Sequence, residues 1–176
     1  MPETLIHPPK TILEVWESLP EGTLCQIINS KLIMSPAPIV KHQQILNEIN
    51  IEISIFLKKN SIGKIFISPI DVHFSDENIL QPDILFIENK NLNIVEKKRV
   101  NGAPNLIIEI LSPSTSQVDY EEKKSVYERF GVQEYFIVDP NTKSVDSFFL
   151  KGNKFEQQKD SIGKIDSKIL GTNILF

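Results

Sequence analysis

The run Leu106-Ile107-Ile108-Glu109-Ile110-Leu111 decides the fold of this chain. Its residues are apolar on both alternating faces apart from one glutamate, a pattern typical of a strand buried inside a sheet. Turn residues at 101–104 precede the run, and residues 112–115 end it. The run therefore predicts a central strand with one charged side chain, Glu109.

Downstream of this strand, the sequence predicts a helix and a second buried strand. Asp119 and Glu122 have the spacing of a capping box, and the helix is expected to end at Phe130 because Gly131 suits the position after a helix end. The apolar run Tyr135-Phe136-Ile137-Val138 then predicts another buried strand. A strand, a helix and a second strand in succession indicate an α/β fold.

Helical and β-prone patterns predict the remaining elements. Three runs before the central strand are expected to form a meander, and two runs near the end of the chain are expected to form exposed edge hairpins. In chain order, the predicted elements are a short helix over residues 11–16 with Thr11 and Glu14 as a capping box, a hairpin over residues 24–28 and 31–34, a long helix over residues 40–57, the meander at 64–68, 70–74 and 84–87, and the edge hairpins at 145–150 and 154–155.

Length, composition and charge limit the class of protein. The chain has 176 residues, 40% of them hydrophobic, a size that one hydrophobic core stabilises, so residues 1–176 are expected to form a single domain. With 19 Lys+Arg against 23 Asp+Glu, the net charge of −4 excludes a protein that coats nucleic acid or anionic membranes by bulk charge. The lone Cys25, and the lack of a secretory leader or membrane-spanning run, predict a cytoplasmic protein without disulfides.

Glu109 is the first candidate functional residue, because an ionised carboxylate in an apolar strand loses several kcal/mol of hydration free energy. A basic partner, a raised pKa or a cation held with other oxygen ligands can offset this loss. Asp83 stands just before the apolar run at 84–87. If the two strands are neighbours, both carboxylates converge at one rim of the sheet and favour a divalent cation. Alternatively, Glu109 reaches solvent or pairs with a lysine, and Asp83 belongs only to a turn.

Lys123 is the third candidate, with Tyr127 four residues later on the same helix face. Lys123 can point back at the two carboxylates. Alternatively, Lys123 and Lys124 form a solvated, salt-bridged face with the acidic residues of the same helix. His42, near the start of the long helix, can reach such a site or act as a surface or capping residue, and no second histidine at ligand spacing supports zinc.

An ordered set of residues runs through the chain: Met34-Ser35-Pro36, His42, Pro82-Asp83, Glu109, Ser112-Pro113-Ser114-Thr115, Asp119, Lys123, Tyr127, Gly131, Glu134-Tyr135 and Val138-Asp139-Pro140. This set resembles the Uma-type restriction endonuclease family, long catalogued as a domain of unknown function, within the PD-(D/E)XK nuclease superfamily. The likeness covers about residues 24–150, which would be the core of the domain, and its most specific part is 103–140.

The resemblance implies a restriction-endonuclease-like α/β core, in which a mixed β-sheet is flanked by helices, with an N-terminal helix and hairpin attached. It also implies a magnesium site at the sheet edge. Asp83 and Glu109 carry over as metal-binding catalytic carboxylates, with the backbone carbonyl of Ile110 as a further ligand. The superfamily's usual lysine position is Leu111 here, and the family resembled supplies its lysine from the following helix, which matches Lys123.

The implied activity is Mg²⁺-dependent hydrolysis of DNA phosphodiester bonds by a homodimer, with Mn²⁺ as a substitute metal. Lys123 would orient or help deprotonate the attacking water and stabilise the developing charge. The accessory candidates are Gln26, Glu48, His42 and Tyr127, and the basic residues expected to contact DNA are Lys97, Lys98, Arg99, Lys123, Lys124 and Arg129.

Two alternatives to the nuclease remain open at the level of sequence. Relatives carry a glutamate in the first hairpin where this chain has Gln26, which favours a weak or inactive nuclease-fold module that binds DNA or a protein partner. The second alternative is a purely structural network in which the acidic residues pair with Lys123 and Arg129.

Overall fold

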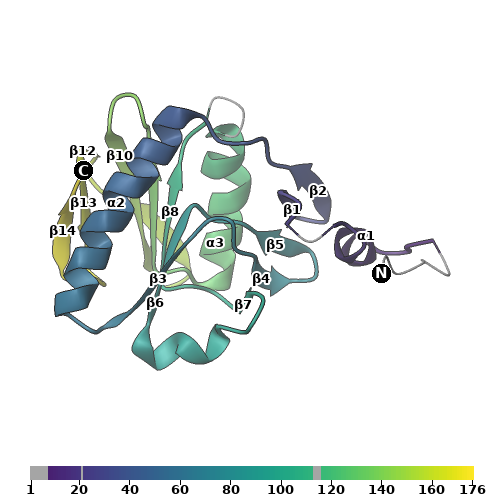
Figure 1. The fold of residues 1–176 in the computed structure, drawn as a ribbon. Helices are drawn as coiled ribbons and strands as arrows, with labels where there is room; N and C mark the ends of the chain where they lie inside the picture. The colour runs from purple at the N-terminus through teal and green to yellow at the C-terminus, as the bar shows by residue number, and fades with distance from the viewer. Residues whose placement is uncertain (1–7, 21, 113–115) are drawn as a thin grey trace.

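The computed structural model describes residues 8–20, 22–112 and 116–176. Figure 1 shows a layered α/β arrangement in which α2 and α3 lie on opposite faces of the largest sheet. Among the described residues, none of the helices is both long and apolar enough to span a membrane. The elements are α1 (Ile12–Glu17), β1 (Cys25–Ile28), β2 (Lys31–Met34), α2 (Val40–Lys59), β3 (Gly63–Ile67), β4 (Val72–Ser75), β5 (Asn78–Leu80), β6 (Ile84–Glu88), the 3₁₀-helix η1 (Asn89–Ile94), β7 (Val100–Asn101), β8 (Leu106–Ile110), the π-helix η2 (Val118–Lys123), α3 (Lys124–Phe130), β9 (Glu134–Val138), β10 (Ser144–Lys151), β11 (Lys154–Gln157), β12 (Ser161–Ile162), β13 (Lys164–Ser167) and β14 (Thr172–Leu175).

The largest sheet has the strand order β11-β10-β9-β8-β6-β3, and β12 pairs with β10. β8 and β9 are parallel because the helical segment between them returns the chain to the same end of the sheet, whereas the other neighbours in this order pair antiparallel. The sheet is therefore mixed. The central strand over residues 106–111 and the α/β class that the sequence predicts are confirmed.

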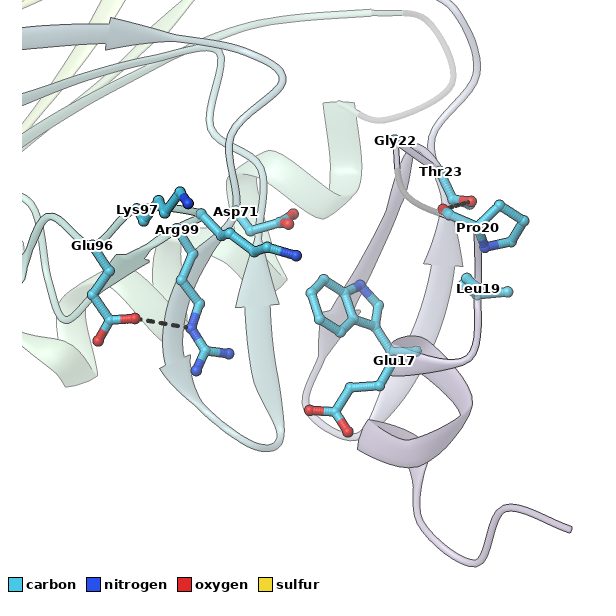
Figure 2. Close-up of a pocket in the computed structure, with 11 residues that line it drawn as sticks. Glu17, Leu19, Pro20, Gly22, Thr23, Asp71, Glu96, Lys97 and Arg99 are labelled. Carbon is cyan, nitrogen blue, oxygen red and sulfur yellow. Dashed lines mark hydrogen bonds and ion pairs between the residues drawn. The ribbon is translucent and has the colours of Figure 1, made fainter. Parts of the chain in front are cut away.

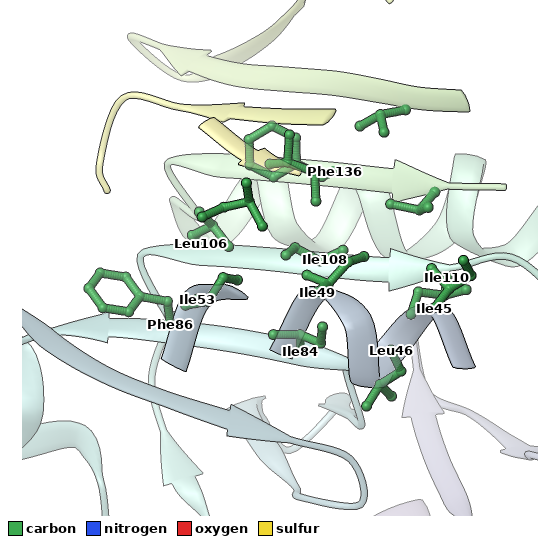
Figure 3. Packing of buried hydrophobic residues seen from close by; sticks show 14 of the residues in the cluster. Ile45, Leu46, Ile49, Ile53, Ile84, Phe86, Leu106, Ile108, Ile110 and Phe136 are labelled. Atoms are coloured by element: carbon green, nitrogen blue, oxygen red, sulfur yellow. The ribbon is translucent and has the colours of Figure 1, made fainter. Parts of the chain in front are cut away.

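The alternating side chains of β8 separate two hydrophobic clusters. Leu106, Ile108 and Ile110 pack with the apolar side of α2, which Figure 3 shows lying across the sheet. Ile107 belongs to the cluster on the opposite face, which includes residues of α3. Because side chains alternate along a strand, Glu109 points to the same face as Ile107. The position of one glutamate in the strand thus selects the α3 side for the site.

A second sheet, with the order β2-β1-β5-β4-β7, packs on the α3 side of the main sheet. The predicted hairpin of β1 and β2 is confirmed, with Asn29 and Ser30 at φ +49° and +62° in its turn. The predicted meander is wrong, because β3 pairs with β6 in the main sheet while β4 and β5 pair in the second sheet. Val72 and Leu80 of these two strands pack in the same buried cluster as Leu85 and Ile87 of β6.

The helical segment after β8 begins earlier than the sequence predicts. Gln117 already has helical backbone angles, with φ −63° and ψ −39°, so Asp119 lies inside the helix and does not cap it. The predicted capping box of Asp119 and Glu122 is therefore wrong, since the buried Asp119 side chain pairs with Lys123 instead. Residues 113–115 of the predicted strand-ending turn lie outside the described residues.

Three other helix boundaries agree with the sequence, although α1 ends at Glu17 and α2 at Lys59, one and two residues later than predicted. Thr11 caps α1 by accepting a hydrogen bond from the backbone N–H of Glu14. α2 begins at Val40 as predicted. α3 ends at Phe130, and Gly131 follows with φ +85°, a left-handed conformation that glycine adopts without steric penalty.

β10 is an internal strand, bonded to β9 on one side and to β11 and β12 on the other. The prediction of exposed edge hairpins is therefore wrong for this strand, whose Val145 and Phe148 are buried. β11 does lie at the edge of the sheet.

A C-terminal hairpin of β13 and β14 adds to the core beside α2 through Ile165 and Ile174. Glu134, at the start of β9, is buried and holds the hairpin turn. Its carboxylate accepts hydrogen bonds from the hydroxyl of Ser167 at 2.6 Å and from the backbone N–H groups of Lys168 and Ile169 at 2.8 and 3.0 Å. The buried acid therefore joins the end of the chain to the main sheet.

Gly63→Ala is expected to destabilise the protein by about 3 kcal/mol, the upper part of the range for overpacked sites. A Cβ at Gly63 on β3 would collide with the carbonyl oxygen of Ile87 and the ring of Phe86. Urea unfolding measures the change in the free energy of unfolding.

Gly152→Ala is the matched control for this substitution. Nothing lies within 4 Å of its added Cβ, so only the left-handed φ of +60° penalises alanine, by about 1 kcal/mol. A loss at Gly63 no larger than the loss at Gly152 would contradict the close approach of β3 and β6.

Candidate active site

Two carboxylates lie opposite each other at one end of β6 and β8. The antiparallel register pairs Ile84 with Ile108, and continuing it by one residue places Asp83 opposite Glu109. The backbone N–H of Ile110 donates a hydrogen bond to Oδ2 of Asp83 at 2.8 Å, which holds Asp83 against β8. The two strands are neighbours, which is the condition for the carboxylates to converge.

Glu109 is the buried acid at the centre of the site, with 2% of its surface exposed. The hydroxyl of Tyr127 donates to its Oε1 at 2.6 Å, and Nζ of Lys123 lies 3.0 Å from its Oε2. Burial raises the pKa of Glu109 from its ordinary value to about 8, although Lys123 acts in the opposite direction. The nearby carboxylates of Asp119 and Asp83 raise this pKa further.

Lys123 is buried inside the cluster, and its Nζ lies 3.0 Å from both Oε2 of Glu109 and Oδ1 of Asp119. Burial lowers the pKa of Lys123, but the carboxylates of Asp119 and Glu109 outweigh this effect and hold the pKa above its ordinary value. Lys123 is therefore a protonated ammonium group. The alternative of a solvated helix face is wrong for Lys123, whereas Lys124 lies apart, with its Nζ 3.9 Å from the ring centre of Phe148.

Asp119 is the residue of this cluster that sequence reasoning missed as a site residue. It lies in the π-helix η2, four residues before Lys123. A π-helix is a rare form that occurs mostly as a single turn, frequently at functional sites. The available signal was this spacing of an acid and a lysine. The capping-box pattern assigned Asp119 to the helix start, and so to solvent.

His42 enters the site from the first turn of α2 and is 5% exposed, so its interpretation as a surface residue is wrong. Its Nε2 lies 3.1 Å from Oδ2 of Asp83, and its Nδ1 has no hydrogen-bond partner among the described residues. This arrangement is satisfied when Nε2–H donates to Asp83. The other oxygen of Asp83, Oδ1, accepts no hydrogen bond from the described residues and is available to a ligand.

These side chains meet at one cavity of about 400 Å³, which we call the carboxylate cavity. Its volume is within the range of small-ligand sites. Residues of β1, of the 35–39 segment and of the start of α2 form the wall opposite the carboxylates. The polar and charged side chains at the heart of the cavity are Gln26, His42, Asp83, Glu109, Asp119 and Lys123.

Two of the four accessory candidates, Gln26 and His42, line the carboxylate cavity. Both ends of the Gln26 amide are bound within the wall, since Oε1 accepts from the backbone N–H of Gln81 and Nε2 donates to Oγ of Ser35, each at 2.9 Å. Tyr127 is buried behind Glu109 and does not line the cavity. Glu48 lies outside the site, because it is 45% exposed and pairs with a lysine of the β9–β10 turn.

The basic residues do not form one surface. Lys123 is buried and pairs with Glu109 and Asp119, so this part of the predicted structural network is formed. Arg129 donates to the side chain of Asn29 and makes no ion pair with Glu109, so its part of the network is not formed. Lys97 and Arg99 line a separate cavity beside α1, which Figure 2 shows. A DNA-binding surface built from all six predicted basic residues is therefore not present.

The donors at the cavity suit a hard cation. Among the residues that the structure describes, no group of three or more His, Cys, Asp or Glu side chains is arranged as a complete metal site. Mg²⁺ is commonly held by one or two carboxylates together with substrate phosphates and waters, so a complete protein cage is not required. Asp83, through its available oxygen, and Glu109 fit this mode of binding, with Glu109 shared between a cation and Lys123.

A mixed sheet with a helix on each face, paired carboxylates at the ends of two neighbouring strands and a lysine from the helix after them define a restriction-endonuclease-like nuclease fold. Residues 13–165 match a family model, Uma2, described as "Putative restriction endonuclease", and the chain belongs to this family. The crystal structure of "a putative nuclease belonging to DUF820" from Anabaena variabilis is similar, with 26% sequence identity and a TM-score of 0.70 over 85% of this chain and 84% of that chain. No curated protein matches the chain. The family resemblance and the mixed, helix-flanked fold are confirmed.

The free energy of unfolding is expected to fall as the pH rises from about 4.5 to about 8, by an amount on the order of a few kcal/mol. Over this range Glu109 stays protonated in the folded protein and ionises in the unfolded chain. A raised folded-state pKa gives stability that is fully present below the unfolded pKa and is lost as the pH passes the folded one. Glu109→Gln removes the titrating group, so its unfolding free energy should decline less.

Urea unfolding at about pH 5 and about pH 9 tests this expectation through the difference between wild type and Glu109→Gln. Glu52→Gln, an exposed position on α2, is the control and should keep the wild-type pH dependence. Equal declines for wild type and Glu109→Gln would contradict a buried acid with a raised pKa.

Proposed function

We propose that the chain is a Mg²⁺-dependent endonuclease that hydrolyses DNA phosphodiester bonds at the carboxylate cavity. The observation that carries the proposal is the meeting of Asp83, Glu109 and Lys123 at one cavity in a chain of a restriction endonuclease family. Asp83 offers an oxygen without a partner among the described residues, and Glu109 is adjacent on the next strand.

Asp83 and Glu109 would hold the cation, with the backbone carbonyl of Ile110 as a further proposed ligand. Glu109, protonated at neutral pH in the metal-free protein, would release its proton on binding, because a carboxylate ligand must be ionised. Bound Mg²⁺ supplies an activated water and offsets negative charge on the phosphate oxygens. Mn²⁺, another cation that prefers oxygen ligands, is expected to substitute. His42 supports this role, because its hydrogen bond engages Oδ2 of Asp83 and leaves Oδ1 for the cation.

Lys123 would act as a charged hydrogen-bond donor. Because Asp119 and Glu109 hold its pKa above the ordinary value, Lys123 keeps its proton at neutral pH and is not the base that deprotonates water. A protonated ammonium next to the reacting phosphate orients the water and stabilises the charge that develops in the transition state. Asp119 is a positioning residue in this scheme, since it holds the ammonium at 3.0 Å.

The alternative function is a non-catalytic nuclease-fold module that binds DNA or a protein. One observation favours it: Lys123 already pairs directly with Glu109, a carboxylate that the nuclease would need for its cation. A homodimer accompanies the nuclease proposal, because cutting both strands of a duplex needs two sites. A cytoplasmic location is proposed with it.

Asp83→Ala and Glu109→Ala are expected to abolish the nicking of plasmid DNA in the presence of Mg²⁺ or Mn²⁺, because each removes a carboxylate that would hold the cation. Gel analysis of plasmid over time measures the nicking. Glu52→Ala, which removes an exposed acid from α2, should cut like wild type. Nicking that persists in both cavity variants would come from a contaminant and would refute the proposal.

Lys123→Met is expected to lower the rate of cleavage by roughly 10²–10³-fold, the effect typical of one charge-stabilising donor. Calorimetry should still show Mn²⁺ binding to this variant, because both carboxylates remain. Wild type that binds no Mn²⁺, or binds it equally well after Asp83→Ala, would support the non-catalytic module. Circular dichroism verifies that each variant is folded.

A further inference from the structure

A second cavity of about 690 Å³ lies beside α1, away from the catalytic carboxylates. Figure 2 shows its two sides, with Asp71, Lys97 and Arg99 on one and Leu19 and Thr23 on the other. We call it the Trp16 cavity after the aromatic residue that also lines it. Its volume falls within the range of ligand-binding pockets.

Trp16 is held in place at this cavity and is not fully buried. Its indole N–H donates to the backbone carbonyl of Cys25 at 3.2 Å, which fixes the ring relative to β1. α1 contains no buried residue, so the ring is not used to fill the core. A fixed, half-buried indole on the wall of a cavity is suited to stacking against a planar ligand.

Three basic residues, Lys97, Lys98 and Arg99, and three acids, Glu17, Asp71 and Glu96, line the cavity, so its charge is balanced and an anionic group would bind at the side formed by the basic residues. Lys97 is exposed and makes no ion pair with the described residues. Arg99 contacts Glu96 through Nε at 3.4 Å, and Glu96 also accepts from Asn101 at 2.9 Å, so this acid is already engaged. The pairing leaves the terminal nitrogens of the Arg99 guanidinium, which suit phosphate oxygens.

Asp71 supplies a hydrogen-bond acceptor across the cavity. Its Oδ1 accepts from the side-chain amide of Gln81 at 2.8 Å, which orients the carboxylate. The exocyclic amino groups of nucleobases are donors that such an oxygen can accept. A ring to stack on, cations for a phosphate and an acceptor for a base edge together match a nucleotide.

The Trp16 cavity and the carboxylate cavity share a wall. Thr23 lines the first and the next residue, Leu24, lines the second. Gln81 joins them, because its side chain bonds to Asp71 while its backbone N–H bonds to Gln26 of the carboxylate cavity. A nucleic-acid strand bound at one cavity can therefore extend toward the other.

We propose that the Trp16 cavity binds one unpaired nucleotide of a single-stranded DNA segment, with its base stacked on Trp16 and its phosphate on Lys97 and Arg99. The choice of DNA rests on the proposed function. A base inside a duplex cannot stack on a protein ring without leaving its neighbours. The preferred substrate is therefore DNA that carries a single-stranded stretch, such as a flap, a gap or a frayed end.

Trp16 is the one tryptophan of the chain, so its fluorescence reports on this cavity directly. Titration of the metal-free protein with a short oligo(dT) is expected to give saturable quenching, because base stacking quenches an indole. A blunt duplex should quench less at equal nucleotide concentration. No quenching, or quenching that rises linearly without saturation, would overturn the proposal, as would equal quenching by inorganic phosphate alone.

Substitutions test whether the oligonucleotide binds at the Trp16 cavity. Trp16→Ala should weaken binding of a labelled oligo(dT), followed by fluorescence anisotropy, by roughly 5- to 150-fold, while Trp16→Phe keeps an aromatic face and most of the affinity. In Lys97→Ala, the slope of log K against the logarithm of salt concentration should be shallower by about 0.7. Lys58→Ala, at the exposed end of α2, is the matched control and should bind like wild type. Equal effects of Lys97→Ala and Lys58→Ala would refute the assignment.

The two proposals fail separately. In Asp83→Asn, cleavage should be lost while the quenching of Trp16 by oligo(dT) remains. Saturable quenching without any cleavage by wild type would refute the nuclease and leave the nucleotide site. Cleavage without quenching, at equal rates on blunt and flapped DNA, would refute the nucleotide site and leave the nuclease.

Discussion

The burial of Glu109 in the central strand is the constraint on which the rest of the site depends. A carboxylate there loses several kcal/mol of hydration free energy unless other groups offset the loss. Tyr127 and Lys123 both contact it, and they can do so only because they lie four residues apart on one helix face. The segment from Lys123 to Tyr127 must therefore be helical and pack its buried side against β8. One acid in a strand thus constrains which side of the next helix faces the sheet.

Local periodicity was enough to predict much of the fold, and tertiary contacts explain what it missed. The central strand, the long helix and the hairpin at Asn29 have patterns that specify their own conformation. Which sheet a short strand joins depends on distant partners, so the meander was wrong: Val72 and Leu80 pack beneath the main sheet. The C-terminal hairpin was not predicted because its turn depends on Glu134, about thirty residues earlier.

In the candidate site, too, residues with a local sequence signal were predicted and residues that depend on tertiary contacts were not. Glu109 and Asp83 were detectable because an acid within or just before an apolar strand departs from the surrounding pattern. Asp119 was not, because an acid near a helix start matches a cap as well as it matches a buried ion pair. The Trp16 cavity is assembled from segments far apart in sequence and has no linear signature. The net charge of −4 is likewise uninformative about either cavity, since a buried lysine accompanies the acids of one and equal numbers of acidic and basic residues line the other.

The π-helix between β8 and α3 affects how relatives should be aligned. A π-turn contains one residue more than an α-turn, and each residue of an α-helix advances its side chains by about 100° around the axis. A homologue with a regular α-helix here would be one residue shorter across positions 118–123. Without a gap at that point, an alignment would match Asp119 or Lys123 to a residue on another helix face. Ancestry would then be recognised correctly while the lysine and its carboxylate partner were assigned to the wrong positions.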